Sequence, residues 1–400
     1  MTLNEERVCS PVSDAELKRR WSATRSKMRD AGIDALLVSG AQDWMNGNIR
    51  WFTGLPANNG YPRSAIFPVE GLMTLCEQGP FNAEMKPDAG ETANRGTGKK
   101  IFTPSFPGAI HYTGRYDAEL LAREISKAGY RTVGLVCAAG MYHGVAQGVK
   151  DLAQGAKFVD ASDLVDAIKS VKSAEEIEMI KRTAAMQDEV MRRVQQHIKP
   201  GMKDFEVAAY AQYIGQMNGS EQGIFLCSSA PAGKPARFMP RAQQARTIRK
   251  GDTLTLLVEN NGPGGMFTEL SRSFVLGKPS QELVDALGVI LEAQQNTLKL
   301  LKPGANCKDI IEAHNAFMRS RGMPEEKRVY CHGQGYDMVE RPLIREDEPM
   351  KIVENMNIVV HPGVMNERVF MTNTDNYLIG PNGPGECIHR TAKKVLEVAC

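Results

Sequence analysis

Two glutamates stand out because each lies within a segment of otherwise apolar, β-branched residues. Glu259 ends the segment TLTLLVE (253–259), Glu269 interrupts MFTELSRSFVL (266–276), and the glycine-rich NNGPGG joins the two segments. Both segments are typical of buried β-strands. Burying a carboxylate costs free energy unless the group is paired or functional. The two glutamates are therefore candidates for acid–base chemistry, with a structural salt bridge as the alternative.

Two histidines lie in segments that also favour a functional site. His332 stands in CHGQGYDMVERP, where glycines allow a ligand to approach the backbone, and His361 ends a strand-like segment in IVVHPG. Imidazole titrates near neutral pH, so we predict that His332 is the main acid–base group. A hydrogen-bonded core histidine is the alternative for each. Cys331 adjoins His332 and is expected to be a buried structural residue.

The same residue types allow a second chemistry. Two imidazoles and one carboxylate form a common metal-binding set. Glu269, His332 and His361 are therefore an alternative site for one zinc or iron ion.

An internal repeat organises the C-terminal part of the chain. IKPGMKDFEV begins at Ile198 and LKPGANCKDI begins at Leu301. Each Lys-Pro-Gly follows a long amphipathic segment and precedes a second helical segment and two strand-like segments. Such a duplication predicts an α+β domain with an internal pseudo-twofold repeat and both hairpins in one sheet. We also expect the first long helix to begin with a capping box, in which Ser173 is the cap and Glu176 its partner.

The N-terminal part alternates helical and strand-like segments. Residues 14–31 form a charged segment with an apolar stripe, and IDALLVSG (33–40) is typical of a buried strand. This alternation predicts an α/β domain. We predict domains at 1–165 and 166–400, separated within a linker-like stretch around 160–172.

Composition excludes several classes of protein. The chain has 400 residues, and its 49 basic and 47 acidic residues give a net charge of +2. A near-neutral chain without a basic block argues against nucleic acid as the main partner. The N-terminal residues lack the apolar region of a secretory signal, and no apolar run is long enough for a membrane span. Eight dispersed cysteines do not form a disulfide framework, so we expect a cytoplasmic protein.

The C-terminal half resembles the pita-bread family, which includes methionine aminopeptidase, prolidase, Xaa-Pro aminopeptidase and creatinase. KGDTLTLLVENNGPGGMFTELSRSFVLG is similar to its first ligand hairpin, and CHGQGYDMVERP to its His-Gly-x-Gly segment. ENMNIVVHPG resembles the strand that normally ends in Glu-Pro-Gly, and TNTDNYLI the closing strand that normally carries Glu-Asp. IDALLVSG and NIRWFTGL resemble the N-terminal domain of the prolidase and creatinase branch, so the resemblance spans nearly the whole chain.

The resemblance implies a two-metal site that this chain does not reproduce. The peptidases hold two divalent ions with two aspartates, one histidine and two glutamates. The matching positions here, in chain order, are Leu257 or Val258, Glu269, His332, His361 and Thr374. This set cannot form a five-ligand dinuclear site. We therefore expect no metal and no other cofactor, as in creatinase, the family type that works without metal.

Resemblance to creatinase also implies arginines that bind a substrate carboxylate. YPR, which contains Tyr61 and Arg63, resembles the Phe-Gly-Arg segment of creatinase, and Arg341 lies near the place of its second arginine. Arg345 competes with Arg341 for that role. Guanidinium groups bind carboxylates through two hydrogen bonds. The creatinase histidine upstream of the first hairpin has no counterpart in the stretch PARFMPRAQQAR, and Arg237 and Arg241 of that stretch are expected to add positive charge to the pocket instead.

The residues and the resemblance together predict a metal-independent, creatinase-like hydrolase that cleaves a C–N bond of a small carboxylate-bearing molecule. Glu269 orients His332 or activates water, and Glu259 stabilises a cationic nitrogen or is the second proton carrier. His361 and Asp375 are polar groups of the site. The alternatives are a lyase, a non-catalytic binding module and a single-metal Xaa-Pro peptidase-like enzyme. Resemblance further implies a homodimer in which an arginine of one chain contributes to the site of the other.

Overall fold

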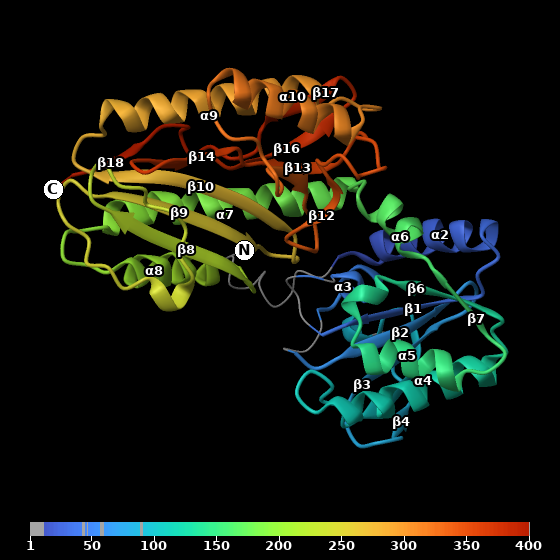
Figure 1. Ribbon diagram of the computed structural model, residues 1–400. Helices are drawn as coiled ribbons and strands as arrows, with labels where there is room; N and C mark the ends of the chain where they lie inside the picture. Colours follow the sequence, from blue (N-terminus) through green and yellow to red (C-terminus); the bar gives the residue numbers. More distant parts are fainter. Residues whose placement is uncertain (1–11, 42–44, 46, 57–59, 89–90, 400) are drawn as a thin grey trace. The chain divides into compact units, whose positions relative to one another are not determined.

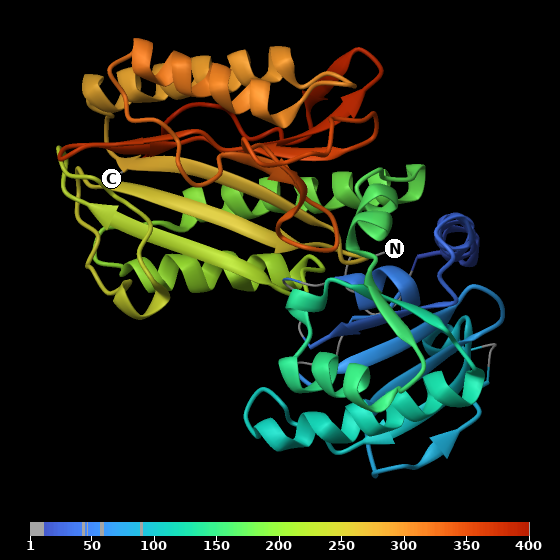
Figure 2. The same cartoon turned by 45° about the vertical axis from the view of Figure 1, so that its right-hand side comes forward.

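The computed structural model describes residues 12–41, 45, 47–56, 60–88 and 91–399. These residues form two compact units that divide between Lys169 and Ser170. The N-terminal unit is α/β and the C-terminal unit is α+β, which confirms the predicted fold class (Figures 1 and 2). No helix among the described residues is long and apolar enough to cross a membrane.

The N-terminal unit contains a seven-stranded sheet in the order β4-β5-β3-β2-β1-β6-β7. Its strands are β1 (Ala35–Gly40), β2 (Arg63–Pro68), β3 (Met73–Gln78), β4 (Glu84–Met85), β5 (Thr97–Thr103), β6 (Thr132–Val136) and β7 (Lys157–Asp160). Its helices are α2 (Asp14–Asp30), α3 (Asn48–Thr53), α4 (Gly114–Ala128), α5 (His143–Leu152) and α6 (Ser162–Lys169). Strand β1 is fully buried, as its apolar sequence predicts.

The first half of the C-terminal unit places two helices against a four-stranded sheet. The helices are α7 (Ala174–His197) and α8 (Asp204–Met217), and the sheet has the order β18-β10-β9-β8. Its strands are β8 (Gly223–Ala230), β9 (Thr253–Asn261), β10 (Phe267–Leu276) and β18 (Leu396–Val398). Apolar residues of both helices and all four strands form one buried cluster. The predicted capping box starts α7, since Ser173 and Glu176 exchange side-chain to backbone hydrogen bonds.

The second half repeats this arrangement with a five-stranded sheet in the order β12-β11-β13-β16-β17. Helices α9 (Gln281–Leu300) and α10 (Cys307–Ser320) pack over it (Figure 1). The strands are β11 (Cys331–Gly333), β12 (Glu340–Leu343), β13 (Asn357–Val360), β16 (Asp375–Gly380) and β17 (Gly383–Cys387), with a separate pair β14 (Gly363–Met365) and β15 (Phe370–Thr372). The helix pair followed by strands therefore occurs twice, as the repeat predicted.

The expectation that both hairpins share one sheet needs correction. Among the described residues, one isolated β-bridge joins the two sheets, between Ser271 of β10 and Thr374, with backbone hydrogen bonds of 3.4 and 3.5 Å. The Phe267 N–H at the start of β10 also donates to the Gly335 carbonyl at 2.7 Å. The carbonyl of Thr374 also accepts a hydrogen bond from the Arg272 guanidinium at 3.0 Å. A side chain thus binds a backbone group at the junction, and the chain leaves regular strand geometry between β15 and β16 there.

Candidate functional site

Two buried carboxyl groups face each other across the hairpin of β9 and β10. Glu269 lies directly opposite Glu259 in the antiparallel register, and the residues are 7% and 8% exposed. Directly opposed side chains in such a pair have Cβ atoms about 4.5–5.5 Å apart. Burial raises the pKa of Glu259 to about 7. Burial and the neighbouring Glu259 raise the pKa of Glu269 well above its ordinary value.

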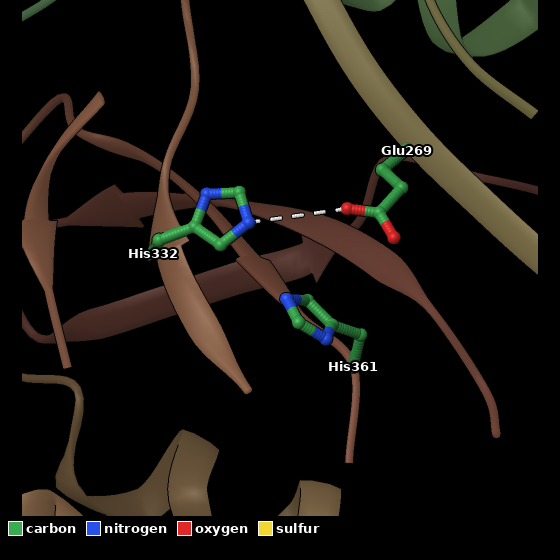
Figure 3. A group of neighbouring side chains, drawn as sticks. All are labelled: Glu269, His332 and His361. Atoms are coloured by element: carbon green, nitrogen blue, oxygen red, sulfur yellow. Dashed lines mark ion pairs between the residues drawn. The ribbon is translucent and has the colours of Figure 1, made fainter. Parts of the chain in front are cut away.

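The paired strands β11 and β13 place two imidazoles beside Glu269. The ring centroids of His332 and His361 are 5.2 Å apart, and His332 Nε2 lies 4.0 Å from Glu269 Oε2. Figure 3 shows the three side chains pointing toward one another, Glu269 from β10, His332 from β11 and His361 from the residue after the end of β13. One ligand atom from each residue lies within 4.8 Å of the other two. The structure therefore brings together three of the four predicted catalytic residues, with Glu259 opposite one of them.

Each histidine of this group is neutral at pH 7. Burial lowers the pKa of His332 to about 4 and the pKa of His361 well below its ordinary value. His332 Nδ1 is 2.9 Å from the carbonyl of Gly333, which can only accept, so Nδ1 carries the proton and Nε2 presents its lone pair. Nε2 of His361 is buried without a hydrogen-bond partner among the described residues. Both rings can thus offer a nitrogen lone pair to a ligand.

Two buried amides that sequence reasoning did not find, Gln334 and Asn376, link the Glu259 carboxyl group to the backbone of Glu269. Gln334 donates to Glu259 at 3.0 Å and to the Met338 carbonyl at 2.9 Å. Asn376 donates to Gln334 at 2.8 Å and accepts from the backbone N–H of Glu269 at 2.8 Å. The Gln334–Asn376 pair therefore contacts both β9, through Glu259, and β10, through Glu269. Gln334 and Asn376 were hard to identify from the sequence, because a neutral amide in a strand can be buried at a lower cost in free energy than a charged group.

Asp375 lies in a different environment from the other predicted residues. Its carboxylate pairs with Arg272 at 2.6 Å and with Lys393 at 3.4 Å, and it lies 3.8 Å from His389. Burial alone would raise the pKa of Asp375, but Arg272 and the other positive groups hold it below its ordinary value. Because neighbouring strand residues face opposite sides, Asn376 reaches Glu269 while Asp375 enters this second network.

The predicted arginines of the C-terminal unit have protein partners. Arg341 pairs with Glu348 at 2.6 Å, and Arg241 donates to Gln212 at 2.8 Å on the surface. A substrate carboxylate would have to compete with Glu348 for Arg341. Arg345, the competing candidate, pairs with an exposed aspartate at 3.0 Å.

The two predicted residues of the N-terminal unit belong to β2 and the loop before it. Arg63 pairs with Glu77 at 2.9 Å and donates to the Pro56 carbonyl at 2.6 Å. Tyr61 is 41% exposed and packs edge-on against Phe106, with ring centroids 5.8 Å apart. Their predicted role in substrate binding stays a prediction.

Cys331 is fully buried with a free thiol, and burial raises its pKa well above the ordinary value. A thiol in that state is a poor nucleophile.

Comparison with known proteins agrees with the resemblance. The chain matches the metallopeptidase family M24 over residues 178–383 and the creatinase/prolidase N-terminal domain over residues 20–171. An uncharacterized hydrolase/peptidase of Sinorhizobium fredii, y4tM, is 26% identical over 81% of this chain and 82% of its own length. A Xaa-Pro dipeptidase of Pyrococcus furiosus is 24% identical over 56% of this chain and 64% of its own length.

Solved structures share the fold of both units. The X-Pro aminopeptidase of Thermotoga maritima superposes with a TM-score of 0.75 at 19% identity, covering 94% of this chain and 99% of that one. A prolidase of Thermococcus sibiricus gives a TM-score of 0.76 at 19% identity, covering 95% and 98%. The prediction of a hydrolytic enzyme with a pita-bread domain is thereby confirmed, and the non-catalytic alternative is set aside. The matches do not support placement in the metal-independent creatinase branch. The chain is a hydrolase that belongs to metallopeptidase family M24 and carries a creatinase/prolidase-type N-terminal domain.

Proposed function

We propose that this protein hydrolyses a C–N bond of a small, carboxylate-bearing amide or dipeptide, with one divalent metal ion held by Glu269, His332 and His361. The observation that carries the proposal is the convergence of these three donor atoms within 4.8 Å. The alternative of a single-metal peptidase-like enzyme is thus preferred to the metal-independent hydrolase.

The donor set fits one ion and not two. A carboxylate and two imidazoles, both neutral, are a common set for zinc or iron(II). The buried and unpartnered Nε2 of His361 is the kind of atom that a metal satisfies. The remaining positions of the family's set hold the apolar Leu257 and Val258 and the neutral Thr374. These side chains offer no charged ligand for a second ion.

Glu269, His332 and His361 would hold the divalent ion, which would act as a Lewis acid toward the substrate carbonyl. Glu259 acts as the general base: its carboxylate takes a proton from water while the water oxygen forms a bond to the carbonyl carbon. The same proton then passes to the leaving nitrogen, the C–N bond breaks, and a carboxylic acid and an amine are released. A carboxyl group whose pKa is about 7 suits both directions of this transfer at neutral pH.

Gln334 keeps Glu259 ready for this role. Its amide donates to one oxygen of the carboxylate, which leaves the other oxygen to accept a proton. The substrate class rests on the family: the relative from Pyrococcus furiosus is named for dipeptides, which carry a free carboxylate.

The test combines elemental analysis with a substrate panel. Purified protein is analysed for zinc, iron, manganese and cobalt and assayed on Xaa-Pro dipeptides and N-acyl amino acids, before and after chelation. We expect about one ion per chain and activity that is lost on chelation and restored by metal. Two ions per chain, or activity in chelated protein that contains no metal, would contradict the proposal.

Metal-independent hydrolysis is the second candidate, and one observation favours it. Two carboxyl groups of raised pKa and two imidazoles are enough for acid–base catalysis without an ion. Full activity in metal-free protein selects this candidate. Incorporation of labelled water oxygen into the product distinguishes either hydrolase from a lyase. The homodimer and the cytoplasmic location stay predictions, and sedimentation of the purified chain tests the first.

A further inference from the structure

A pocket of about 490 Å³ lies in the C-terminal unit outside the group of Glu259, Glu269, His332 and His361. Its lining includes the apolar side chains of Met318, Val364 and Phe370 and two groups that can donate hydrogen bonds, His314 and Arg328. An apolar pocket with a few polar groups is the usual form of a small-molecule site.

The pocket is built on the segments that carry the two histidines of the site. The His361 N–H donates to the Tyr330 carbonyl at 2.7 Å, and the His314 ring stacks on Tyr330 with centroids 3.6 Å apart. Val364 follows His361 by three residues, and Arg328 precedes His332 by four. The pocket is therefore next to the ends of β11 and β13 from which the histidines project.

Arg328 differs from the other arginines of the unit. Its side chain is exposed, and no carboxylate pairs with it among the residues described, whereas Arg341 and Arg345 each have an acidic partner. Burial raises the pKa of Glu259 and Glu269, and the charge of Arg328 acts against that rise in both. The guanidinium is thus close enough to act electrostatically on the reacting groups, yet is available to a ligand.

His314 supplies an uncharged donor to the same pocket. It is 5% exposed, and burial lowers its pKa to about 4, so the ring is neutral at pH 7. Its Nδ1 is buried and has no hydrogen-bond partner within the described part of the chain. A buried polar atom without a partner is costly, and a bound ligand would satisfy it.

The two acidic residues of the lining are engaged locally. Glu325 pairs with Arg319, and Glu326 accepts a hydrogen bond from the backbone N–H of Arg328 at 2.5 Å. Neither forms an ion pair with the Arg328 guanidinium in the described structure.

We propose that this pocket binds the carboxylate end of the substrate, with Arg328 holding the carboxylate, His314 completing the polar contacts, and Met318, Val364 and Phe370 receiving an apolar side chain. The inference rests on the proposed function for the identity of the substrate as a small carboxylate-bearing amide. It assigns carboxylate recognition to Arg328 in place of Arg341 and Arg241. A guanidinium that can form two parallel hydrogen bonds prefers a carboxylate to a neutral amide.

Binding measurements on matched ligands test the assignment without requiring turnover. The probes are N-acetyl-L-leucine and N-acetyl-L-leucinamide, which differ by one charge, and binding is measured by calorimetry. We expect wild type to bind the acid at least about tenfold more tightly than the amide, and Arg328→Gln to lose that preference while its affinity for the amide is unchanged. Arg321→Gln, which removes an exposed arginine of the same unit that pairs with Glu292 and does not line the pocket, serves as the matched control and should keep the preference. Equal binding of both probes by wild type, or a preference that survives in Arg328→Gln, would overturn the proposal.

Kinetics separate failure of this inference from failure of the proposed function. If wild type hydrolyses the substrate panel, Arg328→Gln should raise KM for carboxylate substrates about tenfold or more and leave kcat nearly unchanged. Hydrolysis with an unchanged KM in the variant overturns the pocket assignment alone. Binding of the acid that depends on Arg328, without hydrolysis by wild type, overturns the proposed function and leaves the pocket assignment standing.

Discussion

Glu259 and Glu269 lie directly opposite each other in the β9–β10 register, and both carboxyl groups are buried. Two like charges at this separation in a low-dielectric site repel strongly. One of the two carboxyl groups therefore keeps its proton, unless a cation beside them allows both to ionise. The donor atoms of His332 and His361, next to Glu269, make a metal ion the natural cation here.

The first prediction concerns stability against pH in metal-free protein. The pKa of Glu259 is raised in the folded state to about 7, from 4.5 in an unconstrained chain, and that of Glu269 is also raised. The folded state therefore keeps these carboxyl protons to a higher pH than the unfolded state does, which lowers the free energy of unfolding as pH rises. Below about pH 6.5 the buried histidines, whose pKa values are lowered, act in the opposite direction, so the net loss is expected from about pH 7 upward. Urea unfolding of chelated protein at pH 7 and pH 8.5 measures this loss.

Glu269→Gln serves as the comparison in that experiment. It removes one of the two opposed charges, so its stability should change much less over the same pH range. Wild-type stability that is flat or rises with pH would contradict the raised pKa values.

The second prediction separates the general base from the metal ligands. Glu259→Gln should keep the bound ion and lose activity by about 10²- to 10⁴-fold, because it removes proton transfer and leaves the three donors intact. His332→Ala should lose both the ion and the activity. Elemental analysis and kcat of each purified variant are the measurements, and Glu354→Gln, at an exposed position, is the control. Retention of more than half of the activity by Glu259→Gln is incompatible with its role as the base.

The third prediction concerns Gln334, which holds Glu259 in position. Its hydrogen bond lowers the pKa of Glu259 against the larger effect of burial. Gln334→Met removes that donor, so the acidic limb of the pH–kcat profile should move to higher pH. If Gln334 were merely a packing residue, the variant would lower kcat at every pH without moving the limb.

The fourth prediction concerns Asp375 and Arg272, which form a buried ion pair at 2.6 Å. Asp375→Asn leaves the Arg272 charge buried without its partner and should destabilise the protein by about 3–5 kcal/mol. Because Arg272 and its neighbours lower the pKa of Asp375, this stability is present above the pKa of the unfolded chain and is lost as pH falls. Denaturant titration measures both effects. A variant of unchanged stability with a raised KM would instead support the predicted role of Asp375 in substrate binding.

The sequence predicted the acidic and histidine side chains of the site better than the neutral side chains that support them. Glu259 and Glu269 were visible because a charge within an apolar strand is costly, and His332 because glycines follow it. Gln334 and Asn376 escaped notice because neutral amides leave no such signal.

Contacts between residues far apart in the sequence could also not be predicted from it. Arg328 follows Glu325, Glu326 and Lys327, a run that reads as a solvated charged loop, and its position near the site depends on how that loop folds. The two sheets are joined at Ser271 and Thr374, where the Arg272 side chain binds the Thr374 carbonyl. Neither relationship follows from residue spacing.

The most direct test of the central claim is a calorimetric titration of chelated protein with zinc, performed on wild type and Glu269→Gln. The account predicts about one site per chain in wild type and a large loss of affinity in the variant, since one of three ligands is gone. Two sites in wild type, or equal affinity in Glu269→Gln, would contradict it.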